Sequence, residues 1–508
     1  CTYNIKKMYK TELNQSEFVD FYLPFGGKLN AKNRWVILSK ILPWGDIEKY
    51  YNRDLDESRG APAKSSRIAL GALIIKEKLG LSDRETVDQI LENPYLQYFL
   101  GFKKYQEEPP FDASMMVHFR KRLSAEYLSE INEKMILNQK EIDSGNSEKD
   151  DKNNPPTHKG KLLTDATCAP NDIRFPTDLS LLNEAREKSE AIIDVLHESL
   201  RGKEKKVRTY RKKARKQYLS VAKRKKKGAN IYRKANRQQL GYLKRNLGYI
   251  GELSEKVSLN KLSRREYKTL LVITELHRQQ NEMHITHKHS VSDRIVSISQ
   301  PHVRPIVRGK IAASTEFGAK ITVSLVDGMA YLDRLSWDNY NEGGDLIDQI
   351  EFYKKRFNCY PESVHADKIY RTRQNIKYCK ELGIRFSGPP LGRPSKDVAK
   401  TKKNAKQTYQ DEVDRIPIEG KFGQCKRRFG LGRIMAKLAQ TSASMISLSL
   451  LVANLEKVLC AFILYLNIRG LLADLLHYFQ EKHATFKCNI NATLKILFLT
   501  KNKRPVFC

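Results

Sequence analysis

The chain has 508 residues, enough for about three domains of ordinary size and a substantial hydrophobic core, so a small disulfide-stapled secreted scaffold is excluded. It carries 92 Lys and Arg residues against 58 Asp and Glu residues, a formal net charge of +34. This excess is far larger than solubility requires and indicates a polyanionic partner, with nucleic acid as the first candidate. A membrane surface is the weaker candidate, because no membrane-spanning or amphipathic segment accompanies the basic clusters.

The cysteines and the start of the chain indicate a reducing compartment. The eight cysteines are scattered and form no Cys-x-x-Cys pair, so neither a disulfide framework nor a cysteine-based zinc site is predicted. The first residues are polar and lack the apolar core of a signal peptide. We therefore expect a cytoplasmic, nucleoid-associated protein.

Residues 1–143 are predicted to form a helical N-terminal domain. Ile68–Leu79 is apolar on a helical period, and Ser82 followed by Glu85 is a capping box that opens the next helix. The basic residues 120–122 cluster near the end of this region. They lie either on a DNA backbone or on an ordinary solvated helix face.

The densest charge of the chain lies in residues 201–245, after a predicted linker at 144–160 and a predicted helix at about Leu179–Leu200. This segment contains 20 Lys or Arg residues and one acid, Glu204. Such a run is either disordered or a helix whose charge is met by phosphates, and a solvated helix is the alternative. Four interleaved tyrosines cover apolar surface or touch DNA: Tyr210, Tyr218, Tyr232 and Tyr242. The expected DNA contacts are Lys203, Lys205, Lys206, Arg208, Arg211, Lys212, Lys213, Arg215, Lys223, Arg224, Lys225, Lys226 and Lys227.

Strands that alternate with helices over residues 161–386 predict an α/β fold. The first strand ends at Asp165, and a helix is predicted at Leu346–Phe357. Further strands are predicted at Ile295–Ser299, Val303–Lys310, Ile321–Asp327, Pro361–Asp367 and Ile384–Phe386. A Lys-rich loop is expected at Gly388–Lys406 and a buried packing helix at Thr441–Ile468.

Three acids from distant parts of the chain are candidate metal ligands: Asp165, Asp367 at the end of a later strand, and Glu419 in a late helix. Grouped carboxylates repel one another unless a cation lies among them, and hard oxygen ligands select Mg²⁺ or Mn²⁺. Two such ions activate the attacking oxygen and stabilise the leaving oxygen of an in-line displacement at phosphorus. That is the chemistry of DNA cutting and joining.

The residues around Glu419 narrow the choice of acids. Arg415, Glu419 and Lys426 are spaced i−4, i and i+7, which places them on one face of a helix. Pro417 suits the first turn of that helix, where the positive end of the helix dipole favours an acid. An ordinary surface ladder of Arg, Glu and Lys is the alternative interpretation.

Other residues compete for these roles. Asp327, followed by Gly328, also ends a strand and is an alternative second ligand, whereas Asp333 and Asp338 are expected to be loop acids. A transition-metal site at a group of histidines is a further alternative, although no Cys or acid completes it. The histidines are His284, His287, His289 and His302.

These motifs resemble those of the DDE transposases of bacterial insertion sequences, in the superfamily similar to insertion sequences four and five, over roughly residues 65–460. The resemblance rests on the helical segment Arg67–Leu123, the strand Leu162–Asp165, the run Ala366-Asp367-Lys368-Ile369-Tyr370, and the group Arg415, Glu419 and Lys426. That group matches the Arg, three residues, Glu, six residues, Lys part of the family signature. The chain differs from the family at Glu412, in place of Tyr, and at Ile369, where Gly is frequent.

The resemblance implies a ribonuclease H-like catalytic core, which is a mixed sheet flanked by helices. Asp165, Asp367 and Glu419 would be the catalytic ligands of two Mg²⁺ or Mn²⁺ ions, and Arg415 and Lys426 would contact the transposon-end DNA. The implied organisation is a DNA-binding N-terminal domain at residues 1–143, a catalytic domain at 161–470 with a basic helical insertion at about 173–288, and a C-terminal tail at 471–508.

The implied function is binding of the inverted-repeat ends of an insertion sequence, followed by metal-dependent strand cleavage and strand transfer. The expected partners are double-stranded DNA and, on DNA, a second copy or more of the chain, with no membrane. A catalytically inactive, transposase-derived DNA-binding protein is the alternative, and a plain metal-dependent nuclease is a third possibility.

Overall fold

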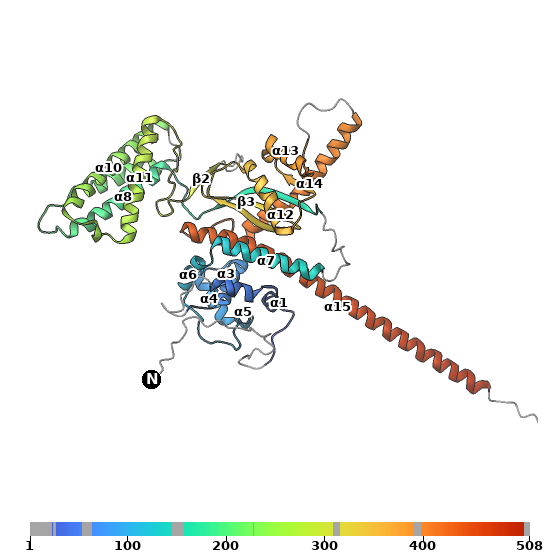
Figure 1. Cartoon of the computed structure of the whole chain (residues 1–508). Coiled ribbons are helices and arrows are strands. Elements are labelled where there is room, and N and C mark those ends of the chain that lie inside the picture. The colour runs from blue at the N-terminus through green and yellow to red at the C-terminus, as the bar shows by residue number, and fades with distance from the viewer. Residues whose placement is uncertain are drawn as a thin grey trace, which may run out of the picture.

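The computed structural model describes residue 23 and residues 27–52, 63–144, 157–226, 228–307, 315–389 and 398–501 (Figure 1). Lys227, one of the expected DNA contacts, and most of the expected linker lie outside these residues. The described chain forms a helical N-terminal region, a mixed sheet flanked by helices, a helical insertion to one side of the sheet, and a long C-terminal helix (Figure 1).

Short helices form the N-terminal region. They are α1 (Arg34–Ile41), α2 (Trp44–Tyr51), α3 (Ser66–Leu79), α4 (Asp83–Glu92), α5 (Pro94–Phe99), α6 (Met115–Arg122) and α7 (Ala125–Ser144). Ser82 and Glu85 form the predicted capping box at the start of α4. Arg120 on α6 is only 9% exposed and forms an ion pair with Asp83 at 2.6 Å. This basic residue therefore stabilises the helix assembly and does not face solvent.

The described strands form one six-stranded mixed sheet with the order β2-β3-β1-β5-β6, and β4 also pairs with β3. The strands are β1 (Lys161–Pro170), β2 (Arg304–Val307), β3 (Thr315–Val326), β4 (Met329–Ser336), β5 (Ser363–Ala366) and β6 (Arg385–Phe386). β1 pairs antiparallel with β3 and parallel with β5. The mixed sheet with flanking helices confirms the α/β prediction.

The sheet differs from the prediction in several places. β1 continues to Pro170, so Asp165 lies within the strand and not at its end. Residues 295–299 form an irregular connection, in which the Ile295 N–H donates to the Gln279 side chain at 2.9 Å instead of to a neighbouring strand. Strand β4 has no counterpart in the prediction. It pairs with β3 through a tight turn at Asp327 and Gly328, whose φ angles are 51° and 73°.

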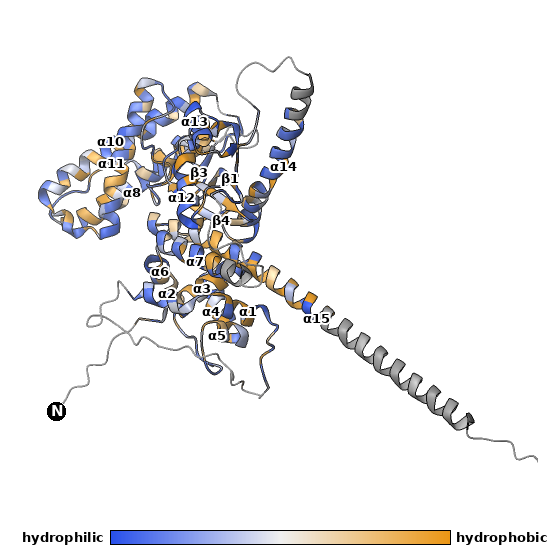
Figure 2. Ribbon diagram, turned by 45° about the vertical axis from the view of Figure 1, so that its right-hand side comes forward, coloured by the Kyte–Doolittle hydropathy of each residue, from blue (hydrophilic) through white to orange (hydrophobic). Residues whose placement is uncertain are grey.

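The insertion is helical and has a hydrophobic core of its own. It comprises α8 (Asp178–Glu198), α9 (Arg211–Ala222), α10 (Ala229–Lys256), η1 (Leu259–Lys261) and α11 (Arg264–Thr286). Leu182, Leu243 and Ile273 are fully buried in this core. Figure 2 shows hydrophobic and hydrophilic residues side by side on α8, α10 and α11, as expected of amphipathic helices that bury one face.

Helix α14 (Val398–Arg428) corrects two expectations. Its first turns occupy the end of the predicted loop, and Pro417 lies inside the helix and not in its first turn. The residues before Pro417 include many good helix formers, which explains why the helix starts early. Two ion pairs also hold this part of α14 on the sheet. Asp411 pairs with Arg385 of β6 at 2.8 Å, and Asp414 pairs with Lys161 of β1 at 2.7 Å.

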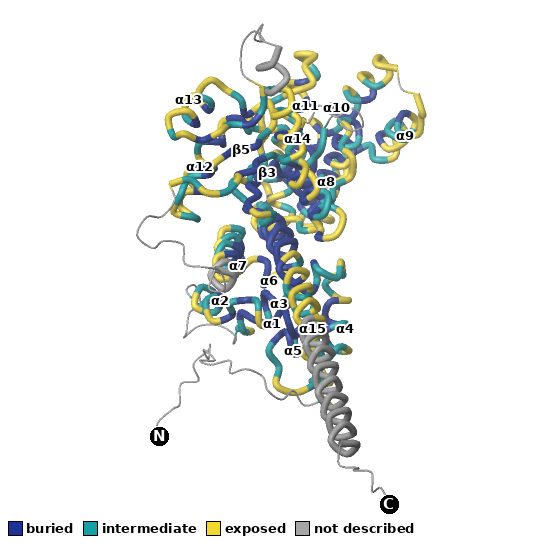
Figure 3. Tube along the Cα trace, turned by 90° about the vertical axis from the view of Figure 1, so that its right-hand side faces the viewer, coloured by how far each residue is buried: buried dark blue, intermediate teal, exposed yellow. Residues whose placement is uncertain are grey.

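The remaining elements complete the core. They are η2 (Glu342–Gly344), α12 (Leu346–Phe357), η3 (Lys368–Tyr370), α13 (Arg373–Glu381) and α15 (Ala439–Lys501). The first turns of α15 are buried beside α7 (Figure 3). The segment Ala439–Arg469 is apolar and long enough to cross a membrane, but 67% of its most apolar window is buried inside the protein. It therefore has the character of the predicted packing helix. α15 continues into the expected C-terminal tail.

Candidate active site

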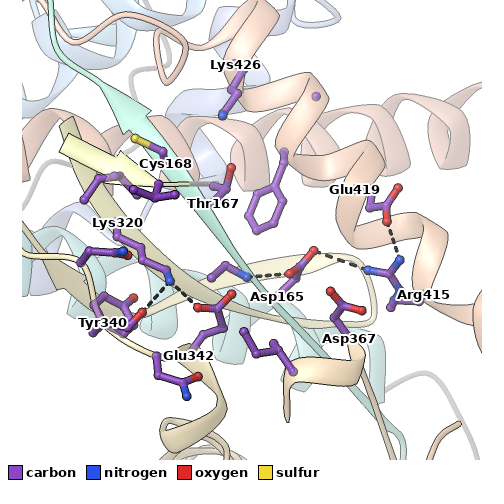
Figure 4. A pocket seen from close by; sticks show the side chains of 18 residues that line it. Asp165, Thr167, Cys168, Lys320, Tyr340, Glu342, Asp367, Arg415, Glu419 and Lys426 are labelled. Carbon is purple, nitrogen blue, oxygen red and sulfur yellow. Dashed lines mark hydrogen bonds and ion pairs between the residues drawn. The ribbon is translucent and has the colours of Figure 1, made fainter. Parts of the chain in front are cut away.

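One pocket with a volume of about 960 Å³ contains all five residues singled out for catalysis and end contacts (Figure 4). Asp165 comes from β1, Asp367 from the segment after β5, and Arg415, Glu419 and Lys426 from α14. Tertiary folding thus brings together three acids that are far apart in sequence. The pocket also has the charge pattern expected for a polyanionic substrate, because cations stand beside the acids.

The parallel pairing of β1 with β5 places Asp367, which directly follows β5, next to Asp165 within β1. Thr164 is in register with Ala366, and each aspartate is the next residue along its chain. Asp367 leaves the strand and caps η3, where its carboxylate accepts the Lys368 N–H at 2.6 Å. Both backbones are therefore fixed by the strand register and the cap.

Arg415 lies between the carboxylates of two different elements. Its guanidinium donates to Glu419, one turn further along α14, at 2.7 Å. The other terminal nitrogen lies 3.6 Å from Asp165. Figure 4 shows this bridge, with Asp367 facing the same space. Arg415 therefore links α14 to β1 and offsets the charge of two acids.

Burial is the main reason that the pKa of Asp165 is raised, to about 6. The carboxylates of Asp367 and Glu419 add to this effect by repulsion, whereas the Ala166 N–H and Arg415 oppose it. The Ala166 N–H donates to the Asp165 side chain at 2.8 Å. The carboxylates of Asp367 and Glu419 are therefore near enough to Asp165 to disfavour its ionised form.

The donor set has the right chemistry for a hard divalent cation, because Mg²⁺ and Mn²⁺ prefer carboxylate oxygens. In the described part of the chain, however, no group of three or more His, Cys, Asp or Glu side chains is gathered closely enough to hold a metal ion. At the candidate site, Arg415 stands between two of the acids. The alternative histidine site is likewise not assembled among the described residues.

Lys426 lies on the same face of α14 as Arg415 and Glu419, and all three line the pocket. Its ammonium is 3.9 Å from Glu316 at the start of β3. In Figure 4 it stands apart from the three acids, further along the helix. Of the two cations predicted on this helix face, Arg415 therefore stands among the acids and Lys426 stands apart from them.

Three further residues that line the pocket were not predicted from the sequence: Lys320, Tyr340 and Glu342. Lys320 is only 9% exposed, donates to the Tyr340 carbonyl at 2.6 Å and pairs with Glu342. Lys320 lies between Ala319 and Ile321 in the middle of β3, and a lysine within such an apolar run is a detectable signal for a buried charge. No sequence spacing, however, connects Lys320 to Glu342, because the β3–β4 hairpin lies between them.

The rival acids lie elsewhere. Asp327 forms the β3–β4 turn, where its carbonyl accepts a hydrogen bond from Lys457, and it does not line the pocket. Asp333 is a buried residue of β4 and not a loop acid, since it pairs with Arg356 at 2.9 Å. Asp338 is in a loop, as predicted, and its side chain is 71% exposed.

The basic segment divides into paired and exposed cations. Lys206 and Arg211 both pair with Asp194 on α8, at 2.6 and 2.5 Å. Tyr232 accepts the Leu179 N–H through its hydroxyl and packs in a small apolar cluster, so it covers apolar surface. Apart from Lys206, which is paired although exposed, the exposed candidates are Lys203, Lys205, Arg208, Lys212, Lys213, Arg215, Lys223, Arg224, Lys225 and Lys226.

Comparisons with known proteins give two family matches. The model described as "Transposase DDE domain" matches residues 364–456, and the model described as "Transposase domain (DUF772)" matches residues 24–122. The uncharacterized protein ORF8 in the nfe locus of Rhizobium meliloti is 30% identical over 157 residues, which are 31% of this chain and 71% of that protein. No solved structure matches the chain.

Proposed function

Because this chain belongs to the DDE transposases of insertion-sequence type, we propose that it binds the ends of its own element and catalyses metal-dependent DNA strand cleavage and strand transfer. The observation that carries the proposal is the meeting of Asp165, Asp367 and Glu419 in one pocket beside Arg415 and Lys426. The sheet, in which β1 is antiparallel to one neighbour and parallel to the other, supports a ribonuclease H-like core.

Asp165, Asp367 and Glu419 would hold two Mg²⁺ or Mn²⁺ ions. When bound, such ions would activate the attacking oxygen and stabilise the leaving oxygen of an in-line displacement at phosphorus. With a pKa of about 6, the Asp165 carboxyl is mostly ionised at neutral pH and is able to act as a ligand. Arg415 favours the ionised state of Asp165 and orients Glu419.

Arg415 and Lys426 would also grip the DNA backbone, because their charges lie on the same helix face as Glu419. The exposed cations of the insertion would extend this contact along the duplex. In the first step, water cleaves a phosphodiester at the end of the element and leaves a 3′ hydroxyl. In the second, that hydroxyl attacks a phosphodiester of target DNA, and no external energy source is required because one ester replaces another.

The test uses linear DNA that carries the inverted repeats flanking the gene, with Mg²⁺ present and absent. The wild-type protein is expected to cut at the repeat ends only with Mg²⁺ and to join the ends to a second DNA. Asp367→Asn should abolish both products. Asp338→Asn, which changes an exposed acid outside the pocket, is the matched control and should retain them.

Each outcome separates the candidate functions. Equal product from the wild type and Asp367→Asn would refute the assigned acids. Binding without product from either protein would favour the inactive DNA-binding alternative. Cut ends that never become joined would indicate a plain nuclease.

A further inference from the structure

A second hollow, here called the basic groove, lies between the helical insertion and the residues that precede α15. It has a volume of about 620 Å³. Five cations line it: Lys188 on α8, Arg264, Arg265 and Lys268 on α11, and Lys437 just before α15. Among the described residues that line it there is no Asp or Glu. None of the five was among the cations expected from the sequence to contact DNA.

Most of these charges are not matched within the protein. Lys188 pairs with Glu184 at 3.5 Å. Arg264, Arg265, Lys268 and Lys437 are exposed, and none of them forms an ion pair with another described residue. Like charges that converge from two parts of the chain repel one another, so folding alone gives no reason to gather them. The arrangement is explained if an anion occupies the groove.

The position of two arginines strengthens this reasoning. Arg264 and Arg265 are the first two residues of α11, where the helix dipole is positive and a cation is unfavourable. The helix start is already satisfied by a capping box between Ser263 and Glu266, so the arginines are not needed for capping. Ser299 also lines the groove, and its hydroxyl adds a neutral polar group on the same side as these cations.

The basic groove is close to the candidate active site along the chain. Ser299 lines the groove and Ile306 lines the active-site pocket. A segment of this length spans at most about 25 Å between those two residues even when fully extended. One turn of duplex DNA covers about 34 Å. A single duplex is therefore long enough to reach both.

We propose that the basic groove binds backbone phosphates of the same DNA duplex whose strand enters the active-site pocket. It holds the insertion and the catalytic core on one DNA, without reading bases. This inference rests on the proposed function and adds to it a second contact surface, distinct from the exposed cations of residues 203–226 and from Arg415 and Lys426.

The test compares two matched variants of the full chain. The groove variant combines Arg264→Gln, Lys268→Gln and Lys437→Gln. The control variant combines Arg373→Gln, Lys355→Gln and Lys380→Gln, which change the same residue types at exposed positions on α12 and α13. DNA affinity is measured against salt concentration for a duplex taken from the flanking inverted repeat and for a scrambled duplex. Circular dichroism checks that each variant is folded.

The groove variant should bind both duplexes more weakly, and the slope of log affinity against log salt should become shallower by about 2.7, because three phosphate contacts are lost. The control should keep the wild-type slope. A single Lys437→Glu variant should weaken binding in the same direction. If the wild type binds DNA and the groove variant keeps its slope, the groove inference is wrong. If the wild type binds neither duplex, the proposed function itself fails.

Discussion

The carboxylate of Glu77 on α3 lies directly against Gly430 in the turn that follows α14. A Cβ atom at Gly430 would come closer to this carboxylate than real Cβ contacts allow. Gly430 also has a φ of 71°, in the left-handed region. The contact joins the N-terminal helices to the helix that carries Glu419, so it connects the two regions that match transposase family models.

Gly430→Ala should therefore destabilise the protein twice, through backbone strain and through the clash with Glu77. We expect a loss of about 2–4 kcal/mol in the free energy of unfolding, measured by urea denaturation. Gly80→Ala is the matched control, because Gly80 has a φ of 70° but open space around its Cβ position. It should lose only about 1 kcal/mol. Equal losses would mean that Glu77 moves aside freely.

The stability of the protein should depend on pH through the ionisation of the Glu77 carboxyl. Burial raises the pKa of its carboxyl to about 7. The unfolded chain ionises this group near its ordinary value of 4.5, so the folded state holds the extra proton between these two values. The stability linked to that proton is complete below pH 4.5 and is lost as the pH rises through 7.

Glu77→Gln should remove this component. Relative to the wild type, the variant should gain stability as the pH rises from 4.5 to 7, by up to about 3 kcal/mol. The measurement is urea unfolding at a series of pH values. Glu108→Gln, at an exposed position, is the control for loss of a negative charge. A difference between wild type and Glu77→Gln that is constant with pH would contradict the assignment.

Asn454 should be a major determinant of stability. It is fully buried on α15, accepts the Ala330 N–H at 2.9 Å, and donates to the Ala330 carbonyl and to Asn132. Asn454→Ala would leave buried groups of β4 and α7 without partners. We expect a loss of about 2–4 kcal/mol in thermal or urea unfolding.

Ser447→Ala provides the matched comparison on the same helix. Ser447 is buried, but its hydroxyl has no hydrogen-bond partner among the described residues. Its removal should change the free energy of unfolding by no more than about 0.5–1 kcal/mol. A large loss for Ser447→Ala would mean that burial alone decides the effect, and a small loss for Asn454→Ala would mean that its hydrogen bonds contribute little.

The cations of the basic insertion should differ in their effect on DNA binding. Lys212 and Lys213 are exposed on α9, whereas Lys206 and Arg211 are paired with Asp194. The double variant Lys212→Gln, Lys213→Gln should make the salt slope of DNA affinity shallower by about 1.8. Lys206→Gln combined with Arg211→Gln should change it much less. Identical slopes in both variants and the wild type would mean that α9 faces away from DNA.

Much of the local structure follows from the sequence. The capping box at Ser82 and Glu85, the helix of the packing segment and the alternation of strands with helices are encoded by short-range patterns. The Asp327-Gly328 pair between apolar runs is also a strong hairpin signal, which the sequence prediction interpreted as a possible ligand instead. That error hid β4 and placed Asp333 in a loop.

Other features depended on distant contacts. The sequence places Asp165 after an apolar run, but pairing with β3 carries β1 on to Pro170. Pro417 is tolerated inside α14, where ion pairs from Asp411 and Asp414 hold the helix on the sheet. Hydrophobic periodicity and capping motifs depend only on residues close together in the sequence. They therefore could not predict the pairing of β1 with β3 or the ion pairs of α14.

The sequence by itself determined the excess positive charge, the alternation of helices with most of the strands, and the identity of the candidate acids. Only the tertiary structure decided that Arg415 stands between Asp165 and Glu419, and that four exposed cations meet in the basic groove. The physical reason is the distance along the chain over which each interaction acts. Backbone preference and hydrophobic periodicity act over a few residues, whereas electrostatic fields are set by groups that meet through space after the chain has folded.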